Sequence, residues 1–127
     1  MNDKKLKKIE RGSSDMFNTL QGQFKCLKEG KLQIIAGPCS IENEFVLDKT
    51  AKRLAELGVK FLRGGAYNPR TSPYDFQGLG KEGLEILNEV GKKYNLITVS
   101  EVVDTRHVEM MTKYVDVLQI GSRNMHN

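Results

Sequence analysis

The chain has 127 residues, of which 39% are hydrophobic and 28% charged, and its formal net charge is +4. This balance suits a globular domain and argues against intrinsic disorder. No apolar run approaches the roughly 20 residues that a membrane span needs, and the amino terminus lacks the apolar region of a secretory signal. Two cysteines in dissimilar contexts, Cys26 and Cys39, do not indicate a disulfide framework. We therefore expect a cytoplasmic protein with no membrane partner.

The excess positive charge lies at the start of the chain. Residues 1–31 hold eight Lys or Arg against four Asp or Glu, and the remaining residues hold twelve of each. A basic terminal segment is usually solvated, and no aromatic residues alternate with these lysines as in nucleic-acid-binding surfaces. We predict no nucleic-acid partner, a basic leader over 1–30 and a folded domain over 31–127. The leader has room for one helix on a weak apolar stripe of Met16, Phe17, Leu20 and Phe24.

The domain begins with a strand, a helix and a second strand. A short apolar run ending at Gly37-Pro38 predicts a strand over 32–36. A helix is predicted over 43–57, with Asn43 as its N-cap and a glycine after its end. The next apolar run predicts a strand over 59–62. The helix buries a stripe at helical spacing, formed by Leu47, Ala51, Leu54 and Ala55.

The same alternation continues after a long loop over 64–80. A helix is predicted over 81–94, a strand over 96–99, a helix capped by Asp104, and a strand over 116–120. Their apolar positions are Leu84, Leu87 and Val90 in the first helix and Val108 and Met111 in the second.

Strands that alternate with helices indicate parallel βα units and an α/β fold. The pattern fits both an open doubly wound sheet and an eight-stranded barrel. A complete barrel needs roughly 250 residues, so four strands in this chain correspond to half of one.

Side chains that bind anions or react stand where each predicted strand ends. The carboxyl ends of parallel strands carry the sites of barrels and open sheets alike. This clustering predicts one shared pocket, and its candidate residues are Cys39, Arg63, Glu101, Ser122 and Arg123.

The loop GGAYNPRTSPYDFQGLG over 64–80 is long for a connection between a strand and a helix, which indicates a functional loop. It places Arg70 beside Thr71, and a guanidinium next to a hydroxyl suits the oxygens of a phosphate. An ordinary surface arginine in a turn is the alternative.

Four motifs resemble those of the 3-deoxy-D-arabino-heptulosonate 7-phosphate (DAHP) synthases, in the short microbial subtype related to the octulosonate phosphate synthases. They are AGPCSIE, LRGGAYNPRTSPYDFQGLG, TVSEVVD and DVLQIGSRNMHN, and the resemblance covers 32–127. It implies the first half of a TIM-type (β/α)8 barrel, truncated after the fourth strand. It also implies a transferase that condenses phosphoenolpyruvate with erythrose 4-phosphate and releases phosphate, the first step of the shikimate pathway to chorismate and the aromatic amino acids.

The resemblance implies roles for the anion-binding residues. Arg63 matches an arginine that binds the phosphoenolpyruvate anion, and Ser122 and Arg123 match a pair that binds the phosphate of that substrate. Arg70 and Thr71 match the site for the phosphate of erythrose 4-phosphate.

Cys39 matches a thiolate ligand of a divalent metal of the Mn, Fe, Co or Zn class, whereas Cys26 is expected to be a small buried residue. Glu101 matches a carboxylate near the phosphoenolpyruvate phosphate. From the residues alone, Glu101 could equally form a salt bridge with Arg63 or Arg123. Three other polar residues have structural interpretations: we expect Gln119 to pack inside the barrel, His107 to lie on a helix surface and His126 to belong to a frayed terminus.

The sequence departs from the family pattern in two respects. Asn68 stands where the family usually has a catalytic lysine, and its amide carries neither charge nor a titratable proton. Losing such a group typically lowers the rate by roughly 10²–10⁴. The later strands that supply a His, a Glu and an Asp to the metal are also missing, so we expect the chain alone to be inactive and its edge strands to be open to pairing.

Two alternatives stay open. One is an octulosonate phosphate synthase-like enzyme that uses arabinose 5-phosphate. The other is a non-catalytic half-barrel fragment, from a truncated or a split gene, that binds phosphorylated metabolites or pairs with a separate carboxyl-terminal half. The full-length family is expected to form homo-oligomers.

Overall fold

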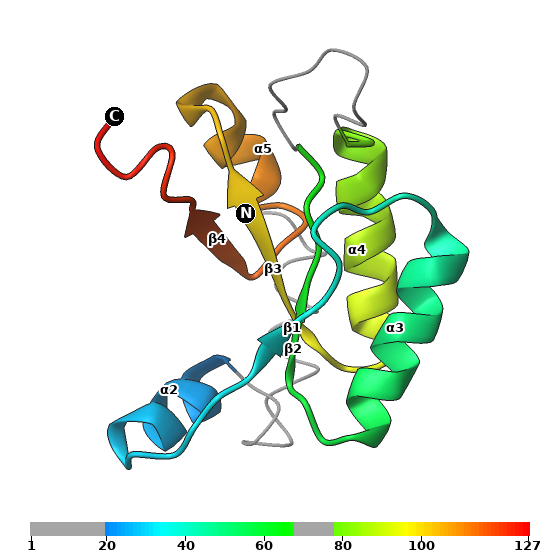
Figure 1. Cartoon of the computed structure of the whole chain (residues 1–127), viewed down its shortest axis with the longest axis vertical. Coiled ribbons are helices and arrows are strands. Elements are labelled where there is room, and N and C mark those ends of the chain that lie inside the picture. The colour runs from blue at the N-terminus through cyan, green and yellow to red at the C-terminus, as the bar shows by residue number, and fades with distance from the viewer. Residues whose placement is uncertain (1–19, 68–77) are drawn as a thin grey trace.

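The computed structural model describes residues 20–67 and 78–127 (Figure 1). Four parallel strands form one open sheet in the order β1-β2-β3-β4, with helices in the connections, which confirms the predicted α/β fold. Within the described residues, no helix is long and apolar enough to cross a membrane. The elements are α2 (Leu20–Lys28), β1 (Ile35–Ala36), α3 (Glu44–Glu56), β2 (Phe61–Arg63), α4 (Lys81–Lys93), β3 (Ile97–Val102), the 3-10 turn η2 (Thr105–His107), α5 (Val108–Met111) and β4 (Val117–Ile120).

Helix α3 begins and ends where local capping signals predicted. The Asn43 side chain accepts a hydrogen bond of 2.9 Å from the backbone N–H of Val46, which satisfies one of the unpaired donors of the first turn. Gly58 follows the helix with a φ of +79°, a left-handed conformation that glycine adopts without strain. The sequence therefore determines the position of this helix locally.

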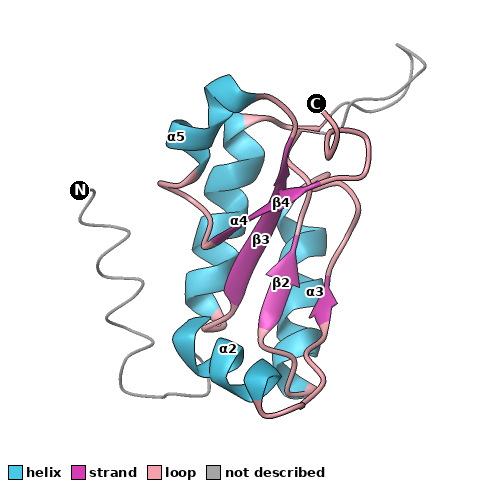
Figure 2. Ribbon diagram, turned by 90° about the vertical axis from the view of Figure 1, so that its left-hand side faces the viewer, coloured by secondary structure: helices cyan, strands magenta, loops and turns pink. Residues whose placement is uncertain are grey.

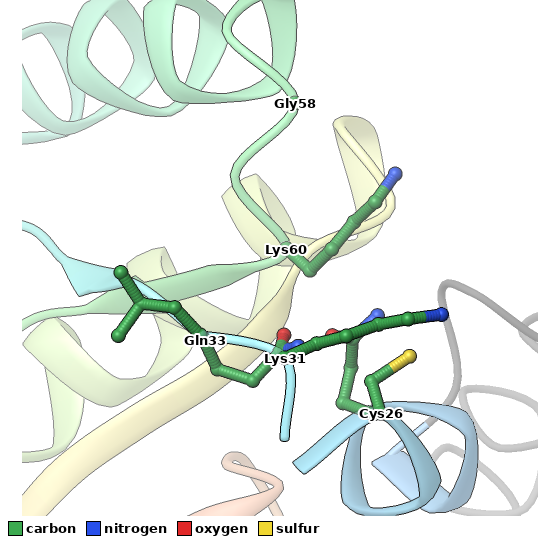
Figure 3. Close-up of a pocket in the computed structure, with 7 residues that line it drawn as sticks. Cys26, Lys31, Gln33, Gly58 and Lys60 are labelled. Carbon is green, nitrogen blue, oxygen red and sulfur yellow. The ribbon is translucent and has the colours of Figure 1, made fainter. Parts of the chain in front are cut away.

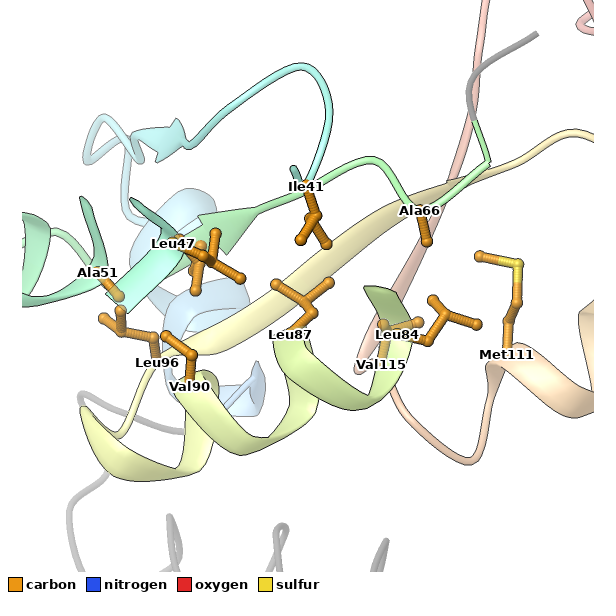
Figure 4. Close-up of a cluster of buried hydrophobic side chains, with 11 residues drawn as sticks. Ile41, Leu47, Ala51, Ala66, Leu84, Leu87, Val90, Leu96, Met111 and Val115 are labelled. Atoms are coloured by element: carbon orange, nitrogen blue, oxygen red, sulfur yellow. The ribbon is translucent and has the colours of Figure 1, made fainter. Parts of the chain in front are cut away.

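Helices α3 and α4 cover one face of the sheet, and the main core lies between them and the strands (Figures 2 and 4). The predicted helix stripes meet there, because Leu47, Leu84 and Leu87 are fully buried. Leu62 of β2 reaches the same core from the sheet. Complete burial of one such side chain contributes roughly 1.5–3 kcal/mol, so this layer supplies most of the stability of the described part.

Strand lengths differ from the prediction because they depend on partners. β1 pairs only with β2, over two residues, and Leu32 in front of it is 88% exposed, so the predicted start at residue 32 is wrong. β3 has a strand on each side and continues to Val102, which pairs with Ile120. Glu101 consequently lies inside β3 and not after it, although still near the carboxyl end.

The third predicted helix is shorter and tighter than expected. Asp104 caps it, since its Oδ1 accepts a hydrogen bond of 2.8 Å from the backbone N–H of Arg106, but the first turn is the 3-10 turn η2. The Arg106 guanidinium also donates to this carboxylate, and together these bonds hold the pKa of Asp104 well below its usual range. The capping carboxylate therefore stays charged, which suits the amino end of a helical turn.

Helix α2 lies across the amino-terminal end of the strands (Figure 2). Leu20 packs against a small cluster of Phe61, Ile97 and Val99 on the face that α3 and α4 leave uncovered. The predicted stripe is wrong at Phe24, which is 54% exposed. The buried residues of α2 are Gly22, Gln23 and Cys26, and the expected burial of Cys26 is confirmed.

Candidate active site

The pairing register brings polar residues of three strands to one face. In a parallel sheet, paired residues point to the same side, and each strand alternates between its two faces. Arg63 pairs with Val99, Val99 with Val117, and Glu101 with Gln119. All five therefore belong to the face turned away from α3 and α4. This surface, called the open face below, also includes Phe61 and Ile97 nearer the amino ends of the strands.

Arg63 and Gln119 are joined directly across the open face. The Nε of Arg63 donates a hydrogen bond of 3.3 Å to Oε1 of Gln119, although 56 positions separate the two residues in the chain. Arg63 is the last residue of β2, so this bond orients the guanidinium at the carboxyl edge of the sheet. The interpretation of Gln119 as packing was therefore incomplete, because the Gln119 side chain also positions Arg63, a residue predicted to bind substrate. The sequence contained a signal for this role, because Gln119 stands near the carboxyl end of the fourth strand, two residues before Gly121.

Glu101 lies beside the chain that leaves β4. A Cβ atom placed on Gly121 would overlap the carboxylate of Glu101, so the missing side chain of Gly121 permits this close approach. The salt-bridge alternative is not realised with Arg63, whose Nε donates to Gln119 instead. Glu101 therefore presents a half-buried carboxylate at the edge of the predicted pocket.

The segment after β1 is held against the end of β2. Gly37 has a φ of +152°, and a Cβ on it would overlap the backbone carbonyl of Arg63, so a side chain here would force the two strand ends apart. Ile41, fully buried, donates a backbone hydrogen bond of 2.9 Å to the carbonyl of Gly65. Cys39 lies between these two anchors and is exposed. The structure thus places the predicted thiol at the same edge of the sheet as Arg63.

The described residues do not by themselves fit a metal ion. Among residues 20–67 and 78–127, no three His, Cys, Asp or Glu side chains gather closely enough to hold one. Zinc and related cations need at least three protein donors. Cys39 would be one donor and would require others from outside the described residues.

Ser122 and Arg123 follow β4 after Gly121, in an exposed turn that a 3.0 Å hydrogen bond from the Asn124 N–H to the Gly121 carbonyl closes. Gly121, which precedes this turn, lies against Glu101, so the turn is at the same carboxyl edge of the sheet as Glu101. His126 lies in the exposed residues after this turn. Three further predicted residues, Asn68, Arg70 and Thr71, lie outside the described residues, and their roles stay predictions.

His107 differs from the prediction. It was expected on a helix surface, but its ring stacks on that of Tyr67, with centroids 4.6 Å apart and planes inclined by 23°. The residue is half-buried in η2, after the carboxyl end of β3. Sequence periodicity did not reveal this contact because the two residues are 40 positions apart.

A hollow of about 470 Å³ lies at the other end of the sheet, between α2 and the start of β2 (Figure 3). Lys31 and Lys60 line it together with Cys26, and Lys31 also pairs with Glu29 at 3.3 Å. Since none of the predicted site residues lines this hollow, it is separate from the site at the carboxyl edge.

The fold defines a class, a parallel βα protein in which polar side chains, Arg63 and Glu101 among them, gather at the carboxyl edge of the sheet. Within that class, residues 16–127 match the DAHP synthetase I family, and the chain belongs to that family. The resemblance inferred from the four motifs is thereby confirmed.

Similarity to individual proteins agrees with this family assignment. The chain is 53% identical over 98 residues to the phospho-2-dehydro-3-deoxyheptonate aldolase of Thermotoga maritima, an alignment that covers 77% of this chain and 29% of the relative. It is 39% identical over 94 residues to a 2-dehydro-3-deoxyphosphooctonate aldolase of Francisella tularensis, covering 68% and 34%. The chain therefore spans about a third or less of the length of these relatives.

Solved structures give the same result. The crystal structure of the T. maritima DAHP synthase superposes with a TM-score of 0.72 at 52% identity, over 76% of this chain and 28% of that one. A truncated form of the T. maritima synthase gives a TM-score of 0.66 at 47% identity, over 76% and 34%. The four-stranded sheet is thus similar to one part of a DAHP synthase.

Proposed function

We propose that this chain supplies the amino-terminal part of a DAHP synthase, which condenses phosphoenolpyruvate with erythrose 4-phosphate to give DAHP and phosphate. The observation that carries the proposal is the hydrogen bond between Arg63 and Gln119, which orients a guanidinium at the carboxyl edge where Glu101 also lies. In an eight-stranded barrel, the open face lines the interior and the carboxyl edge forms the mouth.

The residues of this edge would bind and orient phosphoenolpyruvate. The substrate carries a carboxylate and a phosphate, so arginine donors are needed to neutralise charge and fix its direction. Arg63 would bind the anion, with its guanidinium held in advance by Gln119. Ser122 and Arg123 would bind the phosphate of phosphoenolpyruvate, and Arg70 and Thr71 would bind the phosphate of the second substrate.

The reaction itself follows from the two substrates. C3 of phosphoenolpyruvate attacks the aldehyde carbon of erythrose 4-phosphate, water adds at C2, and phosphate leaves by cleavage of its C–O bond. Fixed guanidinium groups stabilise the charge that accumulates on the phosphate as this bond breaks. Glu101 would act through water beside that phosphate. Asn68 would hydrogen-bond near the aldehyde without supplying a proton, so we expect slow turnover.

The rest of the proposal concerns the surroundings of the site. Cys39 would be one ligand of a divalent metal whose other ligands lie outside the described residues. We also propose a cytoplasmic location and an association with the carboxyl-terminal half of the barrel, in the same chain or in another. Homo-oligomers of the complete barrel are part of the same proposal.

The decisive experiment joins this chain to the remaining part of the T. maritima DAHP synthase. Consumption of phosphoenolpyruvate is measured with erythrose 4-phosphate and a divalent metal, and the product is identified by mass. We expect DAHP from the fusion and no turnover from the 127-residue chain alone. A folded fusion that consumes no phosphoenolpyruvate would contradict the proposal. Turnover by the isolated chain would contradict the statement that the active site needs residues from the carboxyl-terminal half.

The similarity to the Francisella octulosonate aldolase supports a second candidate, an enzyme that takes arabinose 5-phosphate. The same fusion distinguishes the two activities when both aldoses are offered in equal amounts. A product one carbon longer than DAHP would favour the second candidate. Because the acceptor site is completed by both halves, a fusion to the Francisella carboxyl-terminal part is the matched control.

A further inference from the structure

Strand β4 is an outer strand whose own residues specify its register only weakly. Among the described residues it pairs with β3 alone, over Val117–Ile120, and none of these four residues is buried. Register is strongly specified where one face of a strand is buried, a condition that β4 does not meet. Every residue also offers the same backbone N–H and C=O to the ladder. A contact outside the ladder is therefore needed to fix where β4 begins on β3.

Asp116, the residue before β4, makes such a contact with Thr98 of β3. Oδ2 of Asp116 accepts hydrogen bonds from the backbone N–H of Thr98 at 2.9 Å and from its hydroxyl at 3.2 Å. In return, the N–H of Asp116 donates to the carbonyl and to the hydroxyl of Thr98, both at 3.2 Å. Thr98 is fully buried, so a slipped strand would leave its N–H and hydroxyl without these bonds, which is costly.

The register that this pair fixes decides whether Gln119 reaches Arg63. Arg63 pairs with Val99, and Val99 pairs with Val117. Gln119 stands two residues beyond Val117, so the Arg63 guanidinium reaches it diagonally across β3. A slip of β4 by one residue would turn Gln119 to the other face of the sheet, and a slip by two would shift it by roughly 7 Å. Either slip breaks the 3.3 Å bond between the two side chains.

We propose that Asp116 is a positioning residue for the anion site at the carboxyl edge. By holding the start of β4 on Thr98, it places Gln119 opposite Glu101 and within reach of Arg63. Asp116 lies three residues before Gln119, toward the amino end of the sheet, so it acts through Gln119 and not on the substrate. The effect on substrate rests on the proposed function, whereas the link from Asp116 to the Arg63 guanidinium can be tested without any substrate.

The first measurement is hydrogen exchange on the 127-residue chain, followed by NMR. Asp116→Ala removes both bonds that the carboxylate accepts. A hydrogen bond to a charged group contributes a free energy that corresponds to roughly a ten- to hundredfold change in an equilibrium, so the Thr98 amide should exchange faster by about that factor. Exchange of the Arg63 Nε–H, which the bond to Gln119 protects, should rise with it. Asp116→Asn keeps an oxygen acceptor and should stay near the wild-type rates.

Asp48→Ala is the matched control for general loss of stability. Asp48 also accepts two side-chain hydrogen bonds, from Lys93 and Tyr94, but it lies between α3 and α4. It should leave exchange of the Arg63 Nε–H unchanged, and an equal increase in both alanine variants would overturn the proposal. Unchanged Arg63 exchange in Asp116→Ala would overturn it too, as would an asparagine variant as defective as the alanine variant.

A second variant tests the contact from the side of β3. Thr98→Val removes the hydroxyl but keeps the shape of the side chain and the backbone N–H that donates to Asp116. It should therefore speed exchange of the Arg63 Nε–H in the same direction as Asp116→Ala and by a smaller factor. A wild-type rate in Thr98→Val would show that the hydroxyl takes no part in fixing the register.

The third measurement is kcat/KM for phosphoenolpyruvate in the active fusion, as a double-mutant cycle. Asp116→Ala should lower it by up to about tenfold, the loss expected when the acceptor of the Arg63 bond is removed. If Asp116 acts through Gln119, the same substitution should cost less in a Gln119→Leu background, because residues that act on one contact are not additive. Equal factors in both backgrounds would overturn the action through Gln119.

The two proposals fail in different ways. If the fusion is inactive, the proposed function is contradicted, while exchange of the Arg63 Nε–H still decides whether Asp116 positions the guanidinium. If the fusion is active and Asp116→Ala changes neither exchange nor kcat/KM, the proposed function stands and the role of Asp116 is wrong.

Discussion

The two faces of the sheet differ in what covers them and in what their residues do. The face toward α3 and α4 is filled by fully buried aliphatic side chains such as Leu62 and Leu87. The open face becomes polar toward the carboxyl edge, where Arg63, Glu101 and Gln119 lie. In βα proteins, residues at the carboxyl edge carry chemistry, whereas a closed apolar layer carries stability. If the proposed function holds, this chain separates stability and chemistry between the two faces.

The two outer strands of the sheet expose apolar side chains. Ile35 on β1 is 52% exposed and Ile120 on β4 is 67% exposed, and these two strands are the outer strands of the four-stranded sheet. Exposed apolar side chains on outer strands favour pairing with further strands. By register, Ile35 belongs to the open face and Ile120 to the face toward α3 and α4, so both outer strands, and not one face alone, are open to further pairing.

The sharpest way to test the covered face is to truncate one of its buried leucines and to compare the result with the same substitution at an exposed leucine outside the sheet. Leu87→Ala removes a fully buried side chain between α4 and the sheet, and we expect a loss of about 2–5 kcal/mol in the free energy of unfolding. Leu32→Ala, at a position 88% exposed, is the control and should change it by less than about 0.5 kcal/mol. Urea denaturation followed by circular dichroism measures both. Similar losses for the two variants would contradict the stabilising role of the covered face.

The next largest effect should come from Arg63 and should appear in activity. Removing one oriented donor to the substrate anion typically costs about 10²–10³ in rate, so Arg63→Ala in the active fusion should lose activity on that scale. Arg53→Ala, on the exposed surface of α3 where it pairs with Glu56 at 3.4 Å, should leave activity unchanged. Stability should change little in either variant, since neither arginine is in the core. An Arg63→Ala fusion that retains full kcat/KM would refute the site.

Gln119 sharpens the same test because it acts through Arg63. Gln119→Leu removes the acceptor of the 3.3 Å bond without removing the guanidinium, so a smaller loss is expected, about tenfold. Gln119→Glu keeps an acceptor and should preserve more activity than the leucine variant. An effect of Gln119→Leu as large as that of Arg63→Ala would mean that Gln119 touches the substrate itself.

A smaller effect is expected from the cap of α3, on the covered face. Asn43→Ala removes the side chain that accepts from the Val46 N–H and should cost about 1 kcal/mol, while Asn43→Asp keeps an acceptor and should cost less. Thermal unfolding gives the comparison. If alanine and aspartate variants melt at the same temperature as the wild type, the cap contributes nothing to folding.

The smallest effect should be a pH dependence at the surface between α3 and α4. Hydrogen bonds from Lys93 at 2.7 Å and from Tyr94 at 2.8 Å lower the pKa of Asp48 from its ordinary 3.8. A lowered folded-state pKa means that this stabilisation is present above pH 3.8 and is lost as the pH falls through the lower folded value. Asp48→Asn should therefore flatten the stability profile in acid, and an unchanged profile would show that the contact is too exposed to matter.

Some features of the molecule could be predicted from short stretches of sequence, and others could not. Asn43, Gly58 and the Leu47 stripe predicted α3 because capping and helical periodicity are local properties. The end of β3 was misplaced because the length of a strand is decided by the neighbours with which it pairs. The place of Cys39 beside β2 depends on Gly37 and Ile41 contacting residues more than twenty positions away.

The sequence by itself determined the order of strands and helices, the parallel α/β class, the family and the presence of reactive side chains at the strand ends, because each of these follows from local periodicity or from ordered motifs. Only the tertiary structure decided that Gln119 holds Arg63, that Glu101 lies against Gly121, and that His107 stacks on Tyr67. These contacts join residues far apart in the chain, and they form only when the sheet register brings the strands and the turns that follow them together.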